Sequence, residues 1–84
     1  MKLDIYKRPE TEGQFSFMAI PSGKVIPEEV PGEEWEVVTY GREIAHVDDF
    51  SDLSIDKPFD QLEVKGYAIT GAKDLVEGRL QFKL

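Results

Sequence analysis

The chain has 84 residues, which is enough for one small domain but too few for a second core or for an enzyme of the large α/β classes. Ten Lys and Arg residues against 17 Asp and Glu residues give a net charge of −7 at pH 7. This balance argues against a general nucleic-acid binder, whose surface is basic, and against adhesion to anionic membranes. The hydrophobic fraction of 40% is sufficient for a folded core. We therefore expect a single domain over residues 1–84.

The absence of Cys excludes disulfides, thiolate metal sites and a Cys nucleophile. No apolar run approaches the roughly 18 residues that a membrane-spanning helix needs. Charged residues interrupt residues 1–9 too often for the apolar region of a signal peptide. We expect a cytoplasmic protein that binds no cofactor and no membrane.

Two alternating segments near the N-terminus predict a β-hairpin. In residues 3–7, Leu3 and Ile5 fall on one face, and residues 14–20 alternate in the same way. Between them, residues 9–13 begin with Pro and end with Gly, a composition typical of a longer hairpin loop.

The next segment predicts a loop followed by a third strand. Residues 21–32 are too rich in Pro for a regular element, apart from one helical turn near residues 27–30. Residues 35–40 are β-branched and aromatic and predict a strand that ends at Gly41. Beyond it, residues 42–47 either prolong that strand after a bulge at Gly41 or turn away, and residues 48–55 are irregular.

A short helix is predicted at about residues 57–65. Asp56 is a suitable N-cap, Pro58 suits the first turn, and Gly66 suits the residue after the helix. Alternation then predicts strands at residues 67–70 and 78–84. The order β-β-β-α-β-β indicates an α+β fold, a small antiparallel sheet with one short helix packed on a face.

Charge is divided unevenly along the chain. Residues 28–63 hold twelve acidic residues against Arg42 and Lys57, a net charge of −10, whereas the remaining residues carry +3. Such a block is either a solvated face or a surface for a basic partner. We expect a non-enzymatic protein-interaction module that binds an unidentified protein partner and no nucleic acid. The candidate partner-binding residues combine acids with aromatic anchors: Glu33, Glu34, Trp35, Glu36 and Tyr40.

Most large aromatic residues are expected in the core, and Trp35 is the one expected to be partly exposed because acids flank it on both sides. The others considered are Tyr40, Phe50 and Tyr67. The C-terminal strand, residues 79–84, is expected at a sheet edge, where it could pair with a second copy. We expect a monomer or a weak homodimer.

A divalent-cation site in residues 48–63 is an alternative. Counted from Asp52, side-chain oxygens fall at the spacing of a calcium-binding EF-hand loop, but Lys57 stands where the sharp turn requires Gly. This departure weakens the metal prediction.

Two further alternatives are a small enzyme that uses His46 and an acidic protein that mimics DNA. His46 is the sole histidine, and the Ser and Asp residues near it show no recognised catalytic spacing. The acids do not form the regular row that imitation of a phosphate backbone requires.

Residues 2–10, 20–21, 25–27 and 65–70 together resemble a family of short, uncharacterised proteobacterial proteins, a domain of unknown function. The resemblance covers roughly residues 1–75, and the chain departs from it after residue 78. It implies a bacterial, cytoplasmic protein with no assigned activity, and it transfers no catalytic residues.

Overall fold

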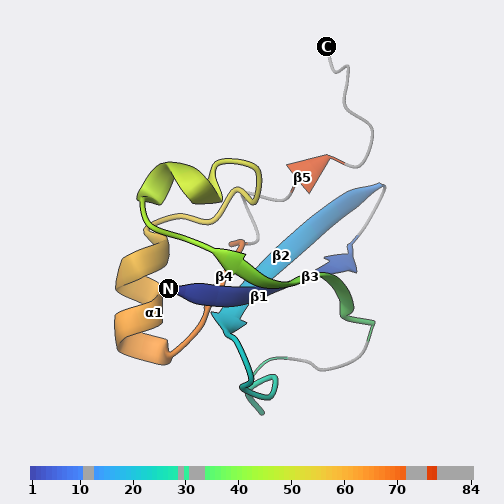
Figure 1. Ribbon diagram of the computed structural model, residues 1–84. Coiled ribbons are helices and arrows are strands. Elements are labelled where there is room, and N and C mark those ends of the chain that lie inside the picture. The colour runs from blue at the N-terminus through green and yellow to red at the C-terminus, as the bar shows by residue number, and fades with distance from the viewer. Residues whose placement is uncertain (11–12, 29, 31–33, 72–75, 78–84) are drawn as a thin grey trace.

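The computed structural model in Figure 1 describes residues 1–10, 13–28, 30, 34–71 and 76–77. Among these residues, three strands, a helix and a fourth strand follow one another in the predicted order, with one added 3₁₀ helix and a short strand at residues 76–77, so the α+β prediction is confirmed. The elements are β1 (Lys2–Pro9), β2 (Gln14–Pro21), β3 (Glu36–Glu43), the 3₁₀ helix η1 (Val47–Phe50), α1 (Pro58–Lys65), β4 (Ala68–Ile69) and β5 (Val76–Glu77).

The sheet is antiparallel throughout and has the strand order β3-β1-β2-β4, with β5 also paired to β2. The predicted hairpin is confirmed, since β1 and β2 pair continuously from Leu3 opposite Pro21 to Pro9 opposite Phe15. β3 is therefore an outer strand, and β4 and β5 share the opposite edge.

β3 continues beyond Gly41 through a bulge, which was one of the two paths predicted for that segment. The pairing with β1 shifts register twice, between Leu3 and Ile5 and between Ile5 and Tyr6. Gly41 has φ of +67°, a conformation that Gly adopts without steric cost. Both shifts add residues to β3, so this strand bends and twists more strongly than β1.

Both faces of the sheet are covered. Alternate residues of the hairpin enter different clusters, with Ile5 in one and Met18 in the other. Figure 1 shows η1 and the loop after it on one side of the strands, and the segment that follows β2 on the other. The first cluster holds Leu3, Ile5, Ala19, Ile44, Phe50, Leu53, Ile55 and Ala68, and the second holds Met18, Ile20, Val30 and Tyr67.

The helix α1 forms where predicted, but its N-cap is Lys57 and not Asp56. A residue before proline is disfavoured in the right-handed helical region, and Lys57 takes φ of +47° instead. The prediction that Asp56 caps the helix is therefore wrong. Gly66 has φ of +85° and closes the helix as predicted, its N–H donating to the carbonyl of Leu62.

The segment predicted to be irregular, residues 48–55, contains most of η1 and three buried apolar residues, Phe50, Leu53 and Ile55. Phe50 meets Phe59 of α1 edge to face, with ring centroids 5.4 Å apart, so η1 and α1 hold each other in place. The strand predicted at residues 78–84 lies outside the described residues.

Candidate functional site at the β3 edge

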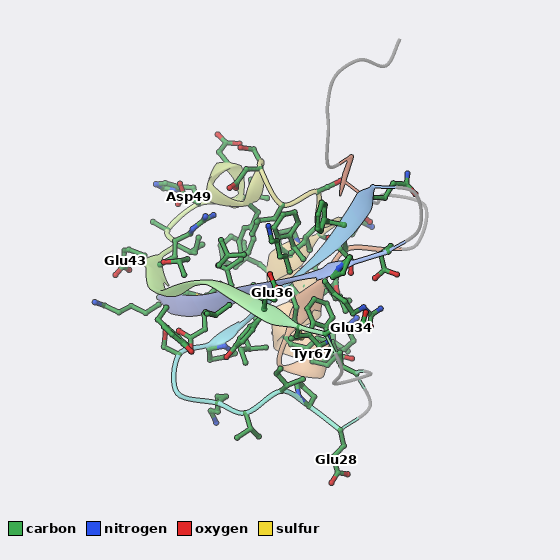
Figure 2. All side chains as sticks on the ribbon, turned by 90° about the vertical axis from the view of Figure 1, so that its right-hand side faces the viewer. Glu28, Glu34, Glu36, Glu43, Asp49 and Tyr67 are labelled. Atoms are coloured by element: carbon green, nitrogen blue, oxygen red, sulfur yellow. The ribbon has the colours of Figure 1, made fainter. Side chains whose placement is uncertain are left out.

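Four of the five predicted partner-binding residues lie on β3 or directly before it, and Glu33 lies outside the described residues. Glu34 and Glu36 are exposed. Tyr40 is 69% exposed, so the expectation that it belongs to the core is wrong. Figure 2 shows Glu36 in front of the sheet, on the strand that forms its edge.

Apolar side chains accompany these acids. Val37 and Val38 are 41% and 43% exposed. Within the described part of the chain, β3 pairs on one side only, with β1. An outer strand presents backbone N–H and C=O groups that are able to pair with another chain. β3 therefore offers an extended backbone, exposed valines and an exposed tyrosine together.

β3 begins at Glu36, one residue later than predicted, and Trp35 lies directly before it. The packing of Trp35 anchors the start of the strand. The indole is half-buried against the second cluster, and the guanidinium carbon of Arg8 lies 4.8 Å from the centre of a Trp35 ring. Arg8 is held in turn by the carboxylate of Glu10, at 2.9 Å. Trp35 is thus an internal anchor of β3, and Tyr40 is the more exposed of the two aromatic residues.

A buried carboxylate determines the shape of the same strand. Asp4 is 6% exposed, and its Oδ1 accepts hydrogen bonds of 2.8 Å from the Ser22 hydroxyl and from the Gly41 N–H. Its Oδ2 accepts a longer bond of 3.3 Å from the Gly23 N–H. These hydrogen bonds lower the pKa of Asp4, and the bond from Ser22 has the largest effect. Sequence reasoning missed this role of Asp4.

Tyr6 interacts electrostatically both with the buried Asp4 and with the exposed Tyr40. Its side chain is half-buried against the second cluster. Burial raises the pKa of Tyr6, and the nearby Tyr40 and Asp4 raise it further. Tyr40 therefore lies close enough to interact electrostatically with β1 while most of its surface remains exposed.

The acidic residues do not gather on one side of the molecule. Figure 2 shows Glu28, Glu34 and Glu43 at widely separated positions around the fold. Glu43 forms an ion pair of 3.0 Å with the N-terminal amine, which offsets its charge. The expectation that the acidic block forms a single face is wrong, because β3, η1 and α1 carry these residues to different parts of the surface.

The carboxylates of residues 48–63, all of which the structure describes, do not meet the geometric requirement for a cation site. No three His, Asp or Glu side chains in the described ranges approach closely enough to hold a metal ion. Asp52 instead pairs with Arg42 at 3.2 Å. The described residues therefore give no support to the alternative of a divalent-cation site in that segment.

His46 is exposed at the start of η1. The nearby carboxylate of Asp49 is held by backbone N–H groups, at 2.8 Å from Ala45 and 3.0 Å from His46. These hydrogen bonds lower the pKa of Asp49, and the bond from Ala45 has the largest effect. Asp49 thus caps η1, and its bonds do not orient the imidazole as a catalytic acid would.

Comparison with known proteins gives one match. Residues 1–76 match the family described as "Family of unknown function (DUF6139)". No curated protein and no solved structure matches the chain. Among the described residues, no helix combines the length and apolarity needed to cross a membrane.

Proposed function

The chain belongs to the DUF6139 family, whose function is unknown, and on the geometry of β3 we propose that it is a protein-interaction module that binds an extended, basic segment of a partner. The partner segment adds a strand to the sheet beside β3. The family match over residues 1–76 confirms the resemblance to a domain of unknown function, and the proteobacterial origin stays a prediction.

One observation carries the proposal: β3 is an eight-residue outer strand with exposed apolar side chains. Strand addition uses backbone hydrogen bonds for affinity and side-chain contacts for specificity. Val37, Val38 and Tyr40 supply apolar contacts next to the backbone edge that no other described strand pairs with. The bulges of β3 twist the edge and so restrict indiscriminate pairing.

The charge of the edge selects the partner. Glu34 and Glu36 are exposed at the N-terminal part of β3, and the whole chain carries −7. Lys or Arg side chains on the partner would meet these carboxylates and be steered toward them by the overall field. Imitation of DNA is not proposed, because the described acids are dispersed over several elements.

The module is proposed to be non-enzymatic and cytoplasmic. The absence of Cys agrees with a reducing compartment. The bonding of Asp49 Oδ2 to the backbone gives this acid a structural role in capping η1, which agrees with the non-enzymatic proposal.

The test is a titration of ¹⁵N-labelled protein with two extended model peptides that alternate Val with Lys or Val with Glu. We expect the basic peptide to shift the amide signals of residues 36–40 and the acidic peptide to leave them unchanged. Raising the salt concentration from about 0.05 M to about 0.5 M should weaken the binding, because exposed charges are screened.

Two double variants distinguish binding at the β3 edge from a general effect of the protein's negative charge. Glu34→Lys with Glu36→Lys should abolish the shifts. Asp60→Lys with Glu63→Lys makes the same charge change at exposed positions of α1 and should preserve them. Equal loss in both pairs, or shifts that avoid β3 altogether, would disprove binding at this edge.

A further inference from the structure

We propose that two copies of this chain pair through their β3 edges, antiparallel about a two-fold axis at Thr39, and thereby cover the binding edge when no partner segment is bound. This inference rests on the proposed function, since it concerns the same edge and adds what regulates access to it. The register of β3 and the charges that this register places on one face of the strand carry it.

The register of β3 is symmetric about Thr39. Three residues of β3 lie opposite alternate residues of β1, in the pairs Lys7 with Glu36, Ile5 with Thr39 and Leu3 with Arg42. Alternate residues of a strand share a face, so these residues of β3 also lie on one face of the sheet. One register shift falls on each side of the central pair. The bulges therefore place Glu36 and Arg42 at equal separations from Thr39, on the same face.

A two-fold axis at Thr39 converts this symmetry into charge complementarity. When Thr39 lies opposite its own copy in an antiparallel pair, Glu36 of each strand comes opposite Arg42 of the other. The axis is perpendicular to the extended sheet, so both copies present the same face on the same side and the charges meet. Opposite charges directly across two strands favour pairing, and the symmetry supplies this pair twice.

Both charged side chains are able to make this contact. Glu36 is exposed, and the side chain of Arg42 is 28% exposed. Arg42 donates to the two carboxylate oxygens of Asp52 at 3.2 and 3.3 Å, and both bonds come from Nη1. Because a guanidinium carries five N–H donors, Arg42 can bind a second carboxylate while it keeps Asp52.

The other face of β3 adds an apolar contact. Val37 lies opposite Tyr6 on that face, and Tyr40 lies near Tyr6 as well. The same two-fold axis brings Val37 of each copy toward Tyr40 of the other, and a pair of an aromatic with a β-branched residue favours strand pairing. Each copy carries a net charge of −7, so general repulsion opposes the association and we expect a weak dimer.

The first test is a charge exchange, measured by sedimentation equilibrium against the monomer mass of 9.5 kDa. The mass of the wild type should rise with concentration toward that of a dimer. Glu36→Arg and Arg42→Glu each place like charges opposite one another twice, and each should weaken association by roughly fivefold or more. The double variant, which exchanges the two charges, should restore association, and so should an equimolar mixture of the single variants.

Two controls separate pairing at β3 from general charge and from the bond to Asp52. Glu63→Arg makes the same charge change as Glu36→Arg at an exposed position of α1 and should not weaken association. Asp52→Asn removes the carboxylate that Arg42 binds within its own chain and should not weaken association either. Circular dichroism confirms that each variant is folded.

The second test locates the two-fold axis. Directly opposite residues of an antiparallel pair have Cα atoms roughly 4.5–5.5 Å apart, a separation that a disulfide can bridge. The chain has no Cys, so Thr39→Cys introduces a single thiol. In air it should form a disulfide-linked dimer roughly tenfold faster than Val64→Cys, whose thiol replaces an 83% exposed side chain on α1. Equal rates for the two variants would overturn the inference.

Competition tests the regulatory part of the inference. A saturating amount of the peptide that alternates Val with Lys should return the wild type to the monomer mass, because the peptide and the second copy would occupy one edge. A dimer that persists with this peptide bound at residues 36–40 would overturn the inference, and so would a double variant that associates as weakly as the single ones.

The outcomes also separate this inference from the proposed function. If the wild type stays monomeric at millimolar concentration while the basic peptide shifts residues 36–40, the inference fails alone. Arg42→Glu provides a monomeric form that keeps Glu34 and Glu36. If the wild type dimerises as expected but the basic peptide leaves residues 36–40 of this variant unchanged, the proposed function fails alone.

Discussion

The carboxylate of Asp4 on β1 accepts a 2.8 Å hydrogen bond from the backbone N–H of Gly41, which lies in the bulge of β3. The same oxygen accepts a bond of equal length from the Ser22 hydroxyl, at the end of the hairpin. One buried carboxylate thus joins three consecutive parts of the sheet. It also fixes the bulge that ends the exposed stretch of β3, so the proposed binding edge depends on a residue outside it.

Asp4→Asn should destabilise the protein and loosen the bulge. The amide retains one acceptor oxygen, but its NH₂ group would face an N–H or O–H donor that the carboxylate now accepts. Hydrogen exchange at the Gly41 amide should accelerate, and the midpoint of thermal unfolding should fall. The control is Glu43→Gln, which loses only an exposed ion pair and should have a clearly smaller effect. Equal effects in the two variants would show that the buried carboxylate has no special role.

The protein should lose stability in acid. Asp4, Glu10 and Asp49 all have lowered pKa values, chiefly through hydrogen bonds from Ser22, Ser16 and the Ala45 N–H respectively. In the unfolded chain the corresponding pKa values are about 3.9 for Asp and 4.3 for Glu. The stabilisation is therefore complete above about pH 5 and is lost as the pH falls through the lowered values. Urea unfolding at a series of pH values measures this slope, and Asp4→Asn should flatten it.

Thr70→Val should cost about 1–3 kcal/mol, because it leaves two polar groups without their partner. The Thr70 hydroxyl donates to the Leu53 carbonyl at 2.9 Å and accepts from the Phe17 N–H at 3.0 Å. Valine keeps the shape of threonine but makes neither bond. Urea unfolding measures the loss, and Thr70→Ser, which retains the hydroxyl, should recover most of it. A Val variant as stable as the wild type would show that these bonds contribute nothing net.

Met18→Ala should cost about 2–5 kcal/mol, the range for truncation of a large core residue. Met18 is fully buried in the second cluster, on the sheet face opposite Ile5. Val64→Ala on α1 is the control, since Val64 is 83% exposed and its truncation should change stability by no more than about 0.5 kcal/mol. Chemical denaturation compares the two. A small loss for Met18 would mean that the second face is not a true core.

The sequence predicted the elements well where local patterns act alone. Alternation in residues 3–7 and 14–20 identified the hairpin, and Gly66 identified the end of α1. It failed at Asp56, because the constraint that Pro58 places on Lys57 outweighs the preference of Asp for a cap. It also failed to predict η1, whose stability comes from burying Phe50 against distant residues.

The partner-binding role of the candidate residues stays a prediction, and the structure adds where they lie. Charges and aromatic rings marked the residues around β3 as candidates, but Tyr40 and not Trp35 is the more exposed of the two aromatic residues. Arg8 covers the indole from another strand, and the outer position of β3 leaves Tyr40 in solvent. The contact of Arg8 with Trp35 and the exposure of Tyr40 both depend on which strands are neighbours in the sheet, and no local pattern contains that information.

By itself, the sequence determined the hairpin, the third strand, the helix and the excess of negative charge, since these depend on spacing along the chain and on composition. Only the tertiary structure decided that β3 lies at the edge, that Asp4 is buried beneath its bulge, and that the acids spread around the surface. Each of these follows from contacts between residues far apart in the chain, such as Asp4 with Gly41. The free energy of such contacts depends on the whole packed arrangement and not on the neighbours of either residue in the sequence.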